Sequence, residues 1–433
     1  MAKIGPKFGL LVMGVVAAAV AMAAYAGDEV TAVGGSRRKL YEYEAGVCDS
    51  FLVTNYRTLA MALLMWGIFY MFWGLAIVCD DYFVSSLEDI SEALNLSSDV
   101  AGATFMAAGS SAPELFTSLM GVFAVKNDVG IGTIVGSAVF NLCCIIGGTA
   151  LFTPQTLVID WKPITRDTLF YFISIVAMIY VLRDGLVTLW EAVALIVCYV
   201  LYVIFMAFNQ SIMEAVTRCT GGTSEKVDDE DDKKEEEEEE EDESPIAKAV
   251  ARPLNIMFEV TIPNCSLPHN KEKYMLTFFT SIIWIGVLSY FMVTWASKLG
   301  CIWGIHPAIM GVTILAAGTS VPDAIGSLLV ARDGQGDMAV SNAIGSNVFD
   351  ILLGLGLPWM LSGLIWPDLP GVSVDATALV PLSIILVGTL VAVYLVALLS
   401  GFRLTKCVGL IFFSFYFIFV AYDLLHEFDM IPF

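Results

Sequence analysis

The sequence predicts an all-α membrane protein of about ten transmembrane helices, arranged as two inverted-topology repeats of five helices and preceded by a signal peptide. Three observations indicate this fold class. Apolar residues make up 57% of the 433 residues and charged residues only 15%, with a mean hydropathy of +0.76, which is unusual for a soluble domain. Apolar windows of about 20 residues, the length that spans a bilayer, recur along the chain. A segment of the first half is also repeated in the second half.

The amino terminus has the composition of a signal peptide, residues 1–26. Lys3 and Lys7 precede an uncharged apolar stretch that ends on small residues at Ala24 and Ala26. This pattern predicts cleavage after Ala26, and an uncleaved membrane anchor is the alternative. Either interpretation places residues 27–57 on the extracellular or lumenal side.

The apolar windows form two groups of five, in residues 58–208 and 275–433. An even number of spans returns the carboxyl terminus to the outside. The cytoplasmic loops of this topology contain more lysine and arginine than the external ends, which agrees with the positive-inside rule. The windows are approximately 58–79, 100–125, 129–153, 168–182, 187–208, 275–296, 305–331, 338–361, 378–400 and 407–425.

Residues 209–274 are predicted to form an acidic cytoplasmic linker between the two groups of spans. Residues 225–243 contain 15 carboxylates and 3 lysines, so about -12 of the net charge of -22 lies in this run. Such a run remains solvated because its like charges repel one another. A calcium-sensing role for the linker is the alternative.

The cysteines and histidines do not predict an enzyme or a zinc protein. Nine cysteines in a chain of this length are not a disulfide scaffold, and the three histidines form no cluster. No nucleophile with a base and no cofactor-binding loop occurs, so neither a cofactor nor a nucleic-acid partner is predicted. Cys48 and Cys301 both fall on the external side, and we predict a disulfide between them.

An internal repeat occurs at an offset of 209 residues. Residues 102–147 aligned without gaps on residues 311–356 give 15 identities in 46 positions. Several identities are residues that are unusual on lipid-facing helices, among them Gly109 with Gly318 and Pro113 with Pro322. The copies begin in spans 2 and 7, an odd number of crossings apart, so they enter the membrane from opposite faces. Inverted repeats of this kind are a recurrent architecture of secondary transporters, with the binding site at the midplane.

Each copy places one acid near the middle of a span, Glu114 in the first and Asp323 in the second. A charged acid at the bilayer centre costs about 2.5–3.5 kcal/mol on insertion scales, so a partner or an aqueous path is expected. No lysine or arginine lies in the middle of a span. The compensating charge must therefore come from a ligand or from protons.

The residues around each acid favour a cation site. Pro113 and Pro322 each remove a helical hydrogen bond and leave carbonyl groups free to face a cavity. Carbonyls, hydroxyls and carboxylates are the hard oxygen ligands that suit Ca2+, and Na+ as well. In spans 3 and 8 the polar pairs Ser137 with Asn141 and Ser346 with Asp350 recur at i, i+4, which places each pair on one helical face.

These motifs resemble the alpha repeats of the cation/calcium exchanger superfamily. The resemblance lies in GATFMAAGSSAPELF and GVTILAAGTSVPDAIGS, each followed by GSAVFN or GSNVFD. The branch that the chain is most similar to is the potassium-dependent sodium/calcium exchangers, and residues 76–83 and 336–340 resemble the same branch. The sequence departs from animal members at Ala324 and Gly326, where bulkier residues are usual.

The resemblance implies an antiporter that exchanges Na+ for Ca2+ together with K+, by alternating access. Glu114 and Asp323 would be the central ligands of Ca2+, shared with Na+. Asp350 marks the potassium-dependent branch. The other implied ligands are hydroxyls or carbonyls of Ser110, Ser111, Thr319 and Ser320, carbonyls of Ala107 and Ala316, and flanking positions at Ser137, Asn141, Ser346 and Asp350.

Other functions remain open at this point. A Ca2+/H+ antiporter could use the same acids, although Asp350 argues against it. A passive channel would not need inverted repeats with broken helices, and small polar residues in spans can serve only as helix-packing surfaces. The sequence leaves open the oligomeric state and whether the multi-pass protein resides in the plasma membrane or an endomembrane.

Overall fold

The computed structural model describes residues 57–93, 107–153, 156–220, 245–267, 270–332, 334 and 336–427. The predicted signal peptide, Cys48 and the acidic run lie outside these residues. Within them the fold is helical apart from four strands of two residues each. The predicted all-α class is therefore correct for the part of the chain that the structure describes.

The first half contains helices that are repeatedly interrupted by π-helical segments, labelled η. Its elements are α3 (Arg57–Val78), η1 (Cys79–Val84), α4 (Ser85–Ala93), α6 (Ala107–Ser110), α7 (Ala112–Met120), η3 (Gly121–Val125), α8 (Val129–Phe140), η4 (Asn141–Ile145), α9 (Ile146–Phe152), β1 (Leu157–Val158), α10 (Trp161–Leu182), β2 (Leu186–Val187) and α11 (Leu189–Thr220).

The second half repeats this order after one additional helix, α12 (Pro245–Thr261), and a short 3-10 turn, η5 (Lys271–Lys273). Its elements are α13 (Tyr274–Trp303), α14 (Pro307–Met310), η6 (Gly311–Leu315), α15 (Ala316–Thr319), α16 (Val321–Arg332), α17 (Gly336–Phe349), η7 (Asp350–Leu355), α18 (Gly356–Ile365), β3 (Val372–Ser373), α19 (Ala376–Leu399), β4 (Arg403–Leu404) and α20 (Lys406–Glu427).

Eight helices in the described residues are long and apolar enough to cross a membrane, or nine if a bent pair counts as one span. The bent pair is Pro307–Thr319 with Val321–Arg332, and its two halves meet at 43°. The start of predicted span 2 lies outside the described residues, and its second half is the shorter apolar helix Ala112–Val125. The chain is thus a multi-pass membrane protein.

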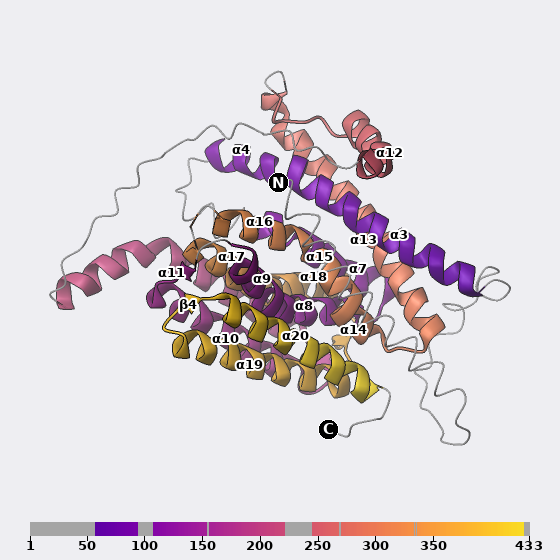
Figure 1. Cartoon of the computed structure of the whole chain (residues 1–433). Coiled ribbons are helices and arrows are strands. Elements are labelled where there is room, and N and C mark those ends of the chain that lie inside the picture. The colour runs from indigo at the N-terminus through magenta and orange to yellow at the C-terminus, as the bar shows by residue number, and fades with distance from the viewer. Residues whose placement is uncertain are drawn as a thin grey trace.

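The long helices surround a buried centre (Figure 1). Helices α3 and α13 pack side by side along one flank, while α10, α19 and α20 form the opposite flank. The centre contains α8, all of whose residues are buried, and the two halves of the bent pair. Cys301, at the end of α13, is disulfide-bonded, whereas its predicted partner Cys48 lies outside the described residues.

Glycines let α8 cross the start of the bent span with the two backbones in contact. A Cβ added to Gly132 would lie 2.0 Å from the carbonyl oxygen of Ala308, and one added to Gly136 would lie 2.3 Å from that of Val312. Small residues that allow such close approach are typical of helix pairs in membranes. The crossing fixes α8 against η6 and α15, which precede the break in the bent span.

The two halves are related element by element, and two short sheets show this relation. Strand β1 of the first half pairs with β4 of the second, and β2 of the first half pairs with β3 of the second, both antiparallel. The aromatic packing is matched as well. The rings of Phe140 and Tyr416 lie 5.5 Å apart at 82°, and those of Phe349 and Tyr199 lie 5.4 Å apart at 88°. Phe140 and Phe349 are equivalent positions of the sequence repeat.

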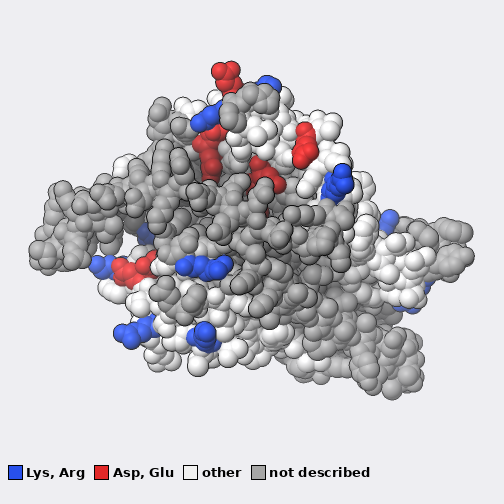
Figure 2. Space-filling view, turned by 45° about the horizontal axis from the view of Figure 1, so that its top comes forward, with Lys and Arg blue, Asp and Glu red and all other residues white. Residues whose placement is uncertain are grey.

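The outer surface is apolar, as expected for helices that face lipid. Exposed side chains on the flanking helices include Trp66 of α3, Ile283 of α13 and Leu395 of α19. On the face shown in Figure 2 the described surface is mostly uncharged, with scattered lysines, arginines and acids. The interior is the unusual part, because several acids and hydroxyls are buried there.

Candidate cation-binding site

The two repeat helices break at equivalent residues, immediately before the two acids. Ser111 has φ -92° and ψ 8°, and Ser320 has φ -85° and ψ 4°, so both leave the helical conformation. Proline follows two residues later at Pro113 and Pro322, where the missing N–H removes a helical hydrogen bond. Glu114 and Asp323 therefore lie in the first turn of the second half-helix, α7 and α16 respectively.

The structure brings three predicted acids together in the interior. Glu114 and Asp350 are 0% exposed and Asp323 is 2% exposed. The charges of Glu114 and Asp323 act on each other, and Asp350 lies within electrostatic range of both. Residues 209 positions apart in the chain thus meet in one buried region, as the inverted repeat predicts.

Most of the carboxylate oxygens lack a protein partner. Ser320 Oγ donates a hydrogen bond of 3.3 Å to Glu114 Oε1. Glu114 Oε2 and both oxygens of Asp323 and Asp350 accept no hydrogen bond from the described residues, and no described basic side chain forms an ion pair with them. Buried charges without partners are strongly unfavourable, so this arrangement requires a cation or protons.

The flanking polar residues begin two π-helical segments. Asn141 is the first residue of η4 and Asp350 is the first residue of η7, at equivalent positions of the repeat. A π segment adds a residue to the helical turn and frequently occurs at functional sites. The extra residue changes which side chains of α9 and α18 share a face with the polar pair.

Several of the predicted neutral ligands lie near the acids. The hydroxyls of Ser110 and Ser346 face Asp323, and that of Ser111 faces Asp350. Ser111, Ser137 and Ser320 are 0% exposed, and Thr319 and Ser346 are 2% exposed. Ser137 and Thr319 donate to carbonyls of their own helices, which leaves their oxygen lone pairs as potential ligands.

The two predicted carbonyl ligands lie at the starts of the helical turns before the breaks. Ala107 begins α6 and Ala316 begins α15. The carbonyl of Ala316 accepts the backbone N–H of Ser320 at 3.2 Å. Because a carbonyl oxygen has two lone pairs, this hydrogen bond still permits cation binding.

Asn347 belongs to the site but was not among the predicted residues. It is 0% exposed, its Oδ1 accepts a hydrogen bond of 2.8 Å from Asn141 Nδ2, and its Nδ2 lies 3.4 Å from the carbonyl of Ala138. Asn141 Nδ2 also lies 3.4 Å from Ser346 Oγ. In the repeat alignment Asn347 is equivalent to Ala138. The replacement of an apolar residue by a polar one at this aligned position is the sequence signal that could have identified Asn347.

The end of α3 also reaches the site. Cys79 in η1 is buried within electrostatic range of Glu114 and Asp323. Its neighbour Asp80 is exposed, yet its charge acts on Asp323. Asp80, which lies in the segment 76–83 that resembles the potassium-dependent branch, is therefore electrostatically coupled to the buried acids.

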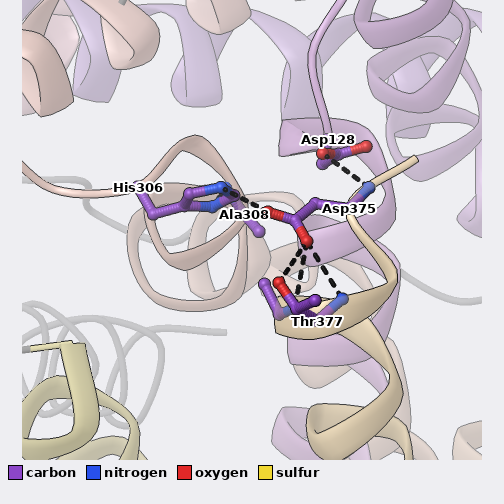
Figure 3. A network of polar contacts seen from close by, with 6 residues as sticks. Asp128, His306, Ala308, Asp375 and Thr377 are labelled. Carbon is purple, nitrogen blue, oxygen red and sulfur yellow. Dashed lines mark hydrogen bonds and ion pairs between the residues drawn. The ribbon is translucent and has the colours of Figure 1, made fainter. Parts of the chain in front are cut away.

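A second polar cluster lies at the helix ends that the predicted topology places outside (Figure 3). His306 Nε2 lies 3.5 Å from Asp375 Oδ2, and the backbone N–H of Asp375 donates to Asp128 Oδ2 at 3.2 Å. Nδ1 of His306 accepts the backbone N–H of Ala308 at 3.1 Å and so caps α14. The cluster joins the starts of α8, α14 and α19.

Burial and hydrogen bonding set the charges in this cluster. Burial lowers the pKa of His306 and outweighs the nearby Asp375 carboxylate, which acts in the opposite direction. Burial raises the pKa of Asp128 to about 6. Burial also acts to raise the pKa of Asp375, but hydrogen bonds from the hydroxyl and N–H of Thr377 outweigh it, so this pKa lies below its usual value.

The geometry therefore defines a multi-pass helical membrane protein with a buried cluster of acids between two related halves. A family model described as "Sodium/calcium exchanger protein" matches residues 64–208 and 273–425. The chain belongs to the sodium/calcium exchanger family.

Curated relatives resemble most of the chain. The human "Sodium/potassium/calcium exchanger 4" is 34% identical over 514 aligned positions, which cover 86% of this chain and 83% of the human protein. The rat "Sodium/potassium/calcium exchanger 3" is 33% identical over 539 positions, covering 89% of this chain and 86% of that protein.

Solved structures of the sodium-calcium exchanger NCX_Mj are also similar. One, soaked with Na+ and Sr2+, is 21% identical, covers 83% of this chain and 98% of its own, and has a TM-score of 0.47.

Proposed function

We propose that the chain is a secondary antiporter that exchanges Na+ for Ca2+ together with K+, by alternating access. The observation that supports this most strongly is the set of three buried acids, Glu114, Asp323 and Asp350, whose oxygens mostly lack protein partners. Their total formal charge of -3 would balance the +3 of one Ca2+ and one K+. The relatives named above, whose names include sodium, potassium and calcium, support the same set of ions.

The ligand chemistry supports Ca2+ and Na+ at the centre of the site. Glu114 and Asp323 each come from a broken helix and together balance one divalent ion. Ca2+ takes six to eight oxygen ligands, and hydroxyls of Ser110, Ser111, Thr319 and Ser320, with carbonyls of Ala107 and Ala316, are available to complete its shell. Na+ would use the same oxygens after Ca2+ leaves, which couples the two fluxes.

The pseudo-symmetry supports alternating access. The proposed architecture has ten spans in two inverted repeats of five, residues 58–208 and 275–433, joined by the linker 209–274. Matched strand pairs, matched helix breaks and matched π segments relate the halves. In transporters built this way, one set of elements rocks against the other around a central site.

The test is ion flux through the purified protein in liposomes. Ca2+ movement is measured with an imposed Na+ gradient, with an imposed H+ gradient, and with K+ replaced by an inert cation. The proposal predicts Ca2+ flux that requires Na+ on the opposite side and K+ on the same side as Ca2+. Flux driven by H+ alone would identify a Ca2+/H+ antiporter, and flux without any counter-ion would identify a channel.

A further inference from the structure

The surroundings of Asp350 contain a group that the repeat motifs do not include. Asp350 is an acid that the second repeat adds within a span, since its equivalent in the first is Asn141. Both oxygens of Asp350 are buried and accept no hydrogen bond from the described residues. Its π segment, η7, packs against α7, α10, α11 and α18.

Helix α10, which packs on η7, carries Tyr171 within electrostatic range of this acid. Tyr171 is 0% exposed, and its hydroxyl makes no hydrogen bond to the described residues. Asp350 acts electrostatically on this hydroxyl. A buried tyrosine hydroxyl normally has a hydrogen-bond partner. The Tyr171 hydroxyl and the Asp350 carboxylate, on two elements that pack together, are therefore both open to a further ligand.

The equivalent interface, between η4 of the first half and α19 of the second, has a leucine in place of this tyrosine. There α19 packs against η4, which begins with Asn141. When the matching N-caps Asp160 of α10 and Asp375 of α19 are aligned, the residue equivalent to Tyr171 is Leu386. The buried face of α19 consists largely of leucines, and its Ser383 hydroxyl already donates to the carbonyl of Leu379 at 2.8 Å. The additional acid of η7 and the additional unpartnered hydroxyl of α10 therefore lie on the two elements of one interface, one from each half of the protein.

We infer that the Tyr171 hydroxyl is an oxygen ligand of the monovalent cation bound at Asp350, and that it contributes to selection of K+ there. This inference rests on the proposed function. One carboxylate balances a single positive charge, and neutral hydroxyls of Tyr171 and Ser111 add dipoles without adding charge. The number and strength of such neutral dipoles is one basis on which protein sites distinguish K+ from Na+.

The test is the substitution Tyr171→Phe, which removes the hydroxyl and retains the ring. Na+-driven Ca2+ flux in liposomes is measured as a function of K+ concentration. We expect the half-activating K+ concentration to rise about tenfold, which corresponds to about 1.4 kcal/mol. The half-saturating concentrations of Ca2+ and Na+, measured at saturating K+, should change by less than about twofold. The relative activation by K+, Rb+ and Li+ should also change.

The matched control is Tyr416→Phe. Tyr416 is a buried tyrosine that packs on Phe140 beside the other π segment, near Cys143 and Cys144. This variant should retain the wild-type response to K+. A binding readout without transport is thermal unfolding, because an ion that binds the folded protein raises its Tm. Tyr171→Phe should need about tenfold more K+ for the same rise in Tm.

An unchanged K+ response in Tyr171→Phe would overturn the inference, and so would equal shifts for K+, Na+ and Ca2+, which would indicate a packing role. A wild type that needs no K+ would overturn both the inference and the K+ component of the proposed function. That outcome is recognised in the wild-type measurement alone, before any variant is compared.

Discussion

Gly136 and Gly345 occupy equivalent positions of the sequence repeat. The structure nevertheless predicts that alanine at Gly136 is destabilising and that alanine at Gly345 is tolerated. A Cβ at Gly136 would lie 2.3 Å from the carbonyl oxygen of Val312, 2.5 Å from its Cα and 2.7 Å from Ala316 Cβ. At Gly345 the nearest atom is Tyr202 Oη at 3.9 Å, which is an ordinary contact. Only the first glycine therefore lies at a backbone-to-backbone crossing.

The magnitude follows from these distances. Real Cβ atoms do not approach other heavy atoms closer than 3.0 Å, so α8 and η6 would have to separate by roughly 1 Å in a close-packed interior. Overpacking of this kind costs about 1–3 kcal/mol. The separation also moves Ser137, the next residue, relative to Ala316 and Thr319, so the Gly136→Ala variant should lose Ca2+ affinity as well as stability.

The assay is the Tm of the purified protein together with Na+-driven Ca2+ flux. Gly136→Ala should lower the Tm by several degrees and reduce flux at low Ca2+ concentration, whereas Gly345→Ala should resemble wild type. Equal behaviour of the two variants, or greater damage from Gly345→Ala, would refute the proposed crossing.

Three further predictions concern the acids, the outer cluster and the cysteines. Asp350→Asn should allow Na+-driven Ca2+ flux without K+, because one positive charge fewer is needed; flux that still requires K+ would show that Asp350 has another role. The lowered pKa of His306 keeps its imidazole neutral at pH 7, so its capping contribution is present above the ordinary value of 6.5 and lost as the pH falls further. His306→Asn keeps a capping side chain, worth about 1 kcal/mol, without a titrating group. The fall in Tm between pH 7 and pH 5 should therefore be smaller in His306→Asn; an identical fall would contradict this, since Asp128 titrates in both proteins. For the predicted pair Cys48 and Cys301, thiol labelling of non-reduced cells should modify neither residue, and labelling of both would reject the pair.

The central acids and the helix breaks could be predicted from the sequence because the repeat contains them. Each copy has a glycine and a proline just before its acid, and the proline alone is enough to indicate a broken helix. Glu114, Asp323 and Asp350 are indeed buried together. The described residues do not include the predicted signal peptide or residues 100–106 at the start of span 2, so those predictions remain untested.

Other features depend on contacts that spacing does not reveal. The i, i+4 spacing does not predict that Asn141 and Asp350 each begin a π segment, whose extra residue changes which side chains share a face. Tyr171 comes from a helix outside the repeat motif, and its relation to Asp350 arises only from the packing of α10 on η7. Likewise, Gly136 and Gly345 are indistinguishable in the alignment because their neighbours come from distant segments.

The most direct test of the central claim is Na+-driven uptake of radioactive Ca2+ into liposomes containing Glu114→Gln or Asp323→Asn. Each substitution removes one of the two central charges while nearly preserving side-chain volume, and a divalent ion in a site of low dielectric depends strongly on both. Both variants should be present in the membrane at wild-type amounts and transport no Ca2+ above the background of empty liposomes. Near-normal uptake by either variant would contradict the assignment of the site.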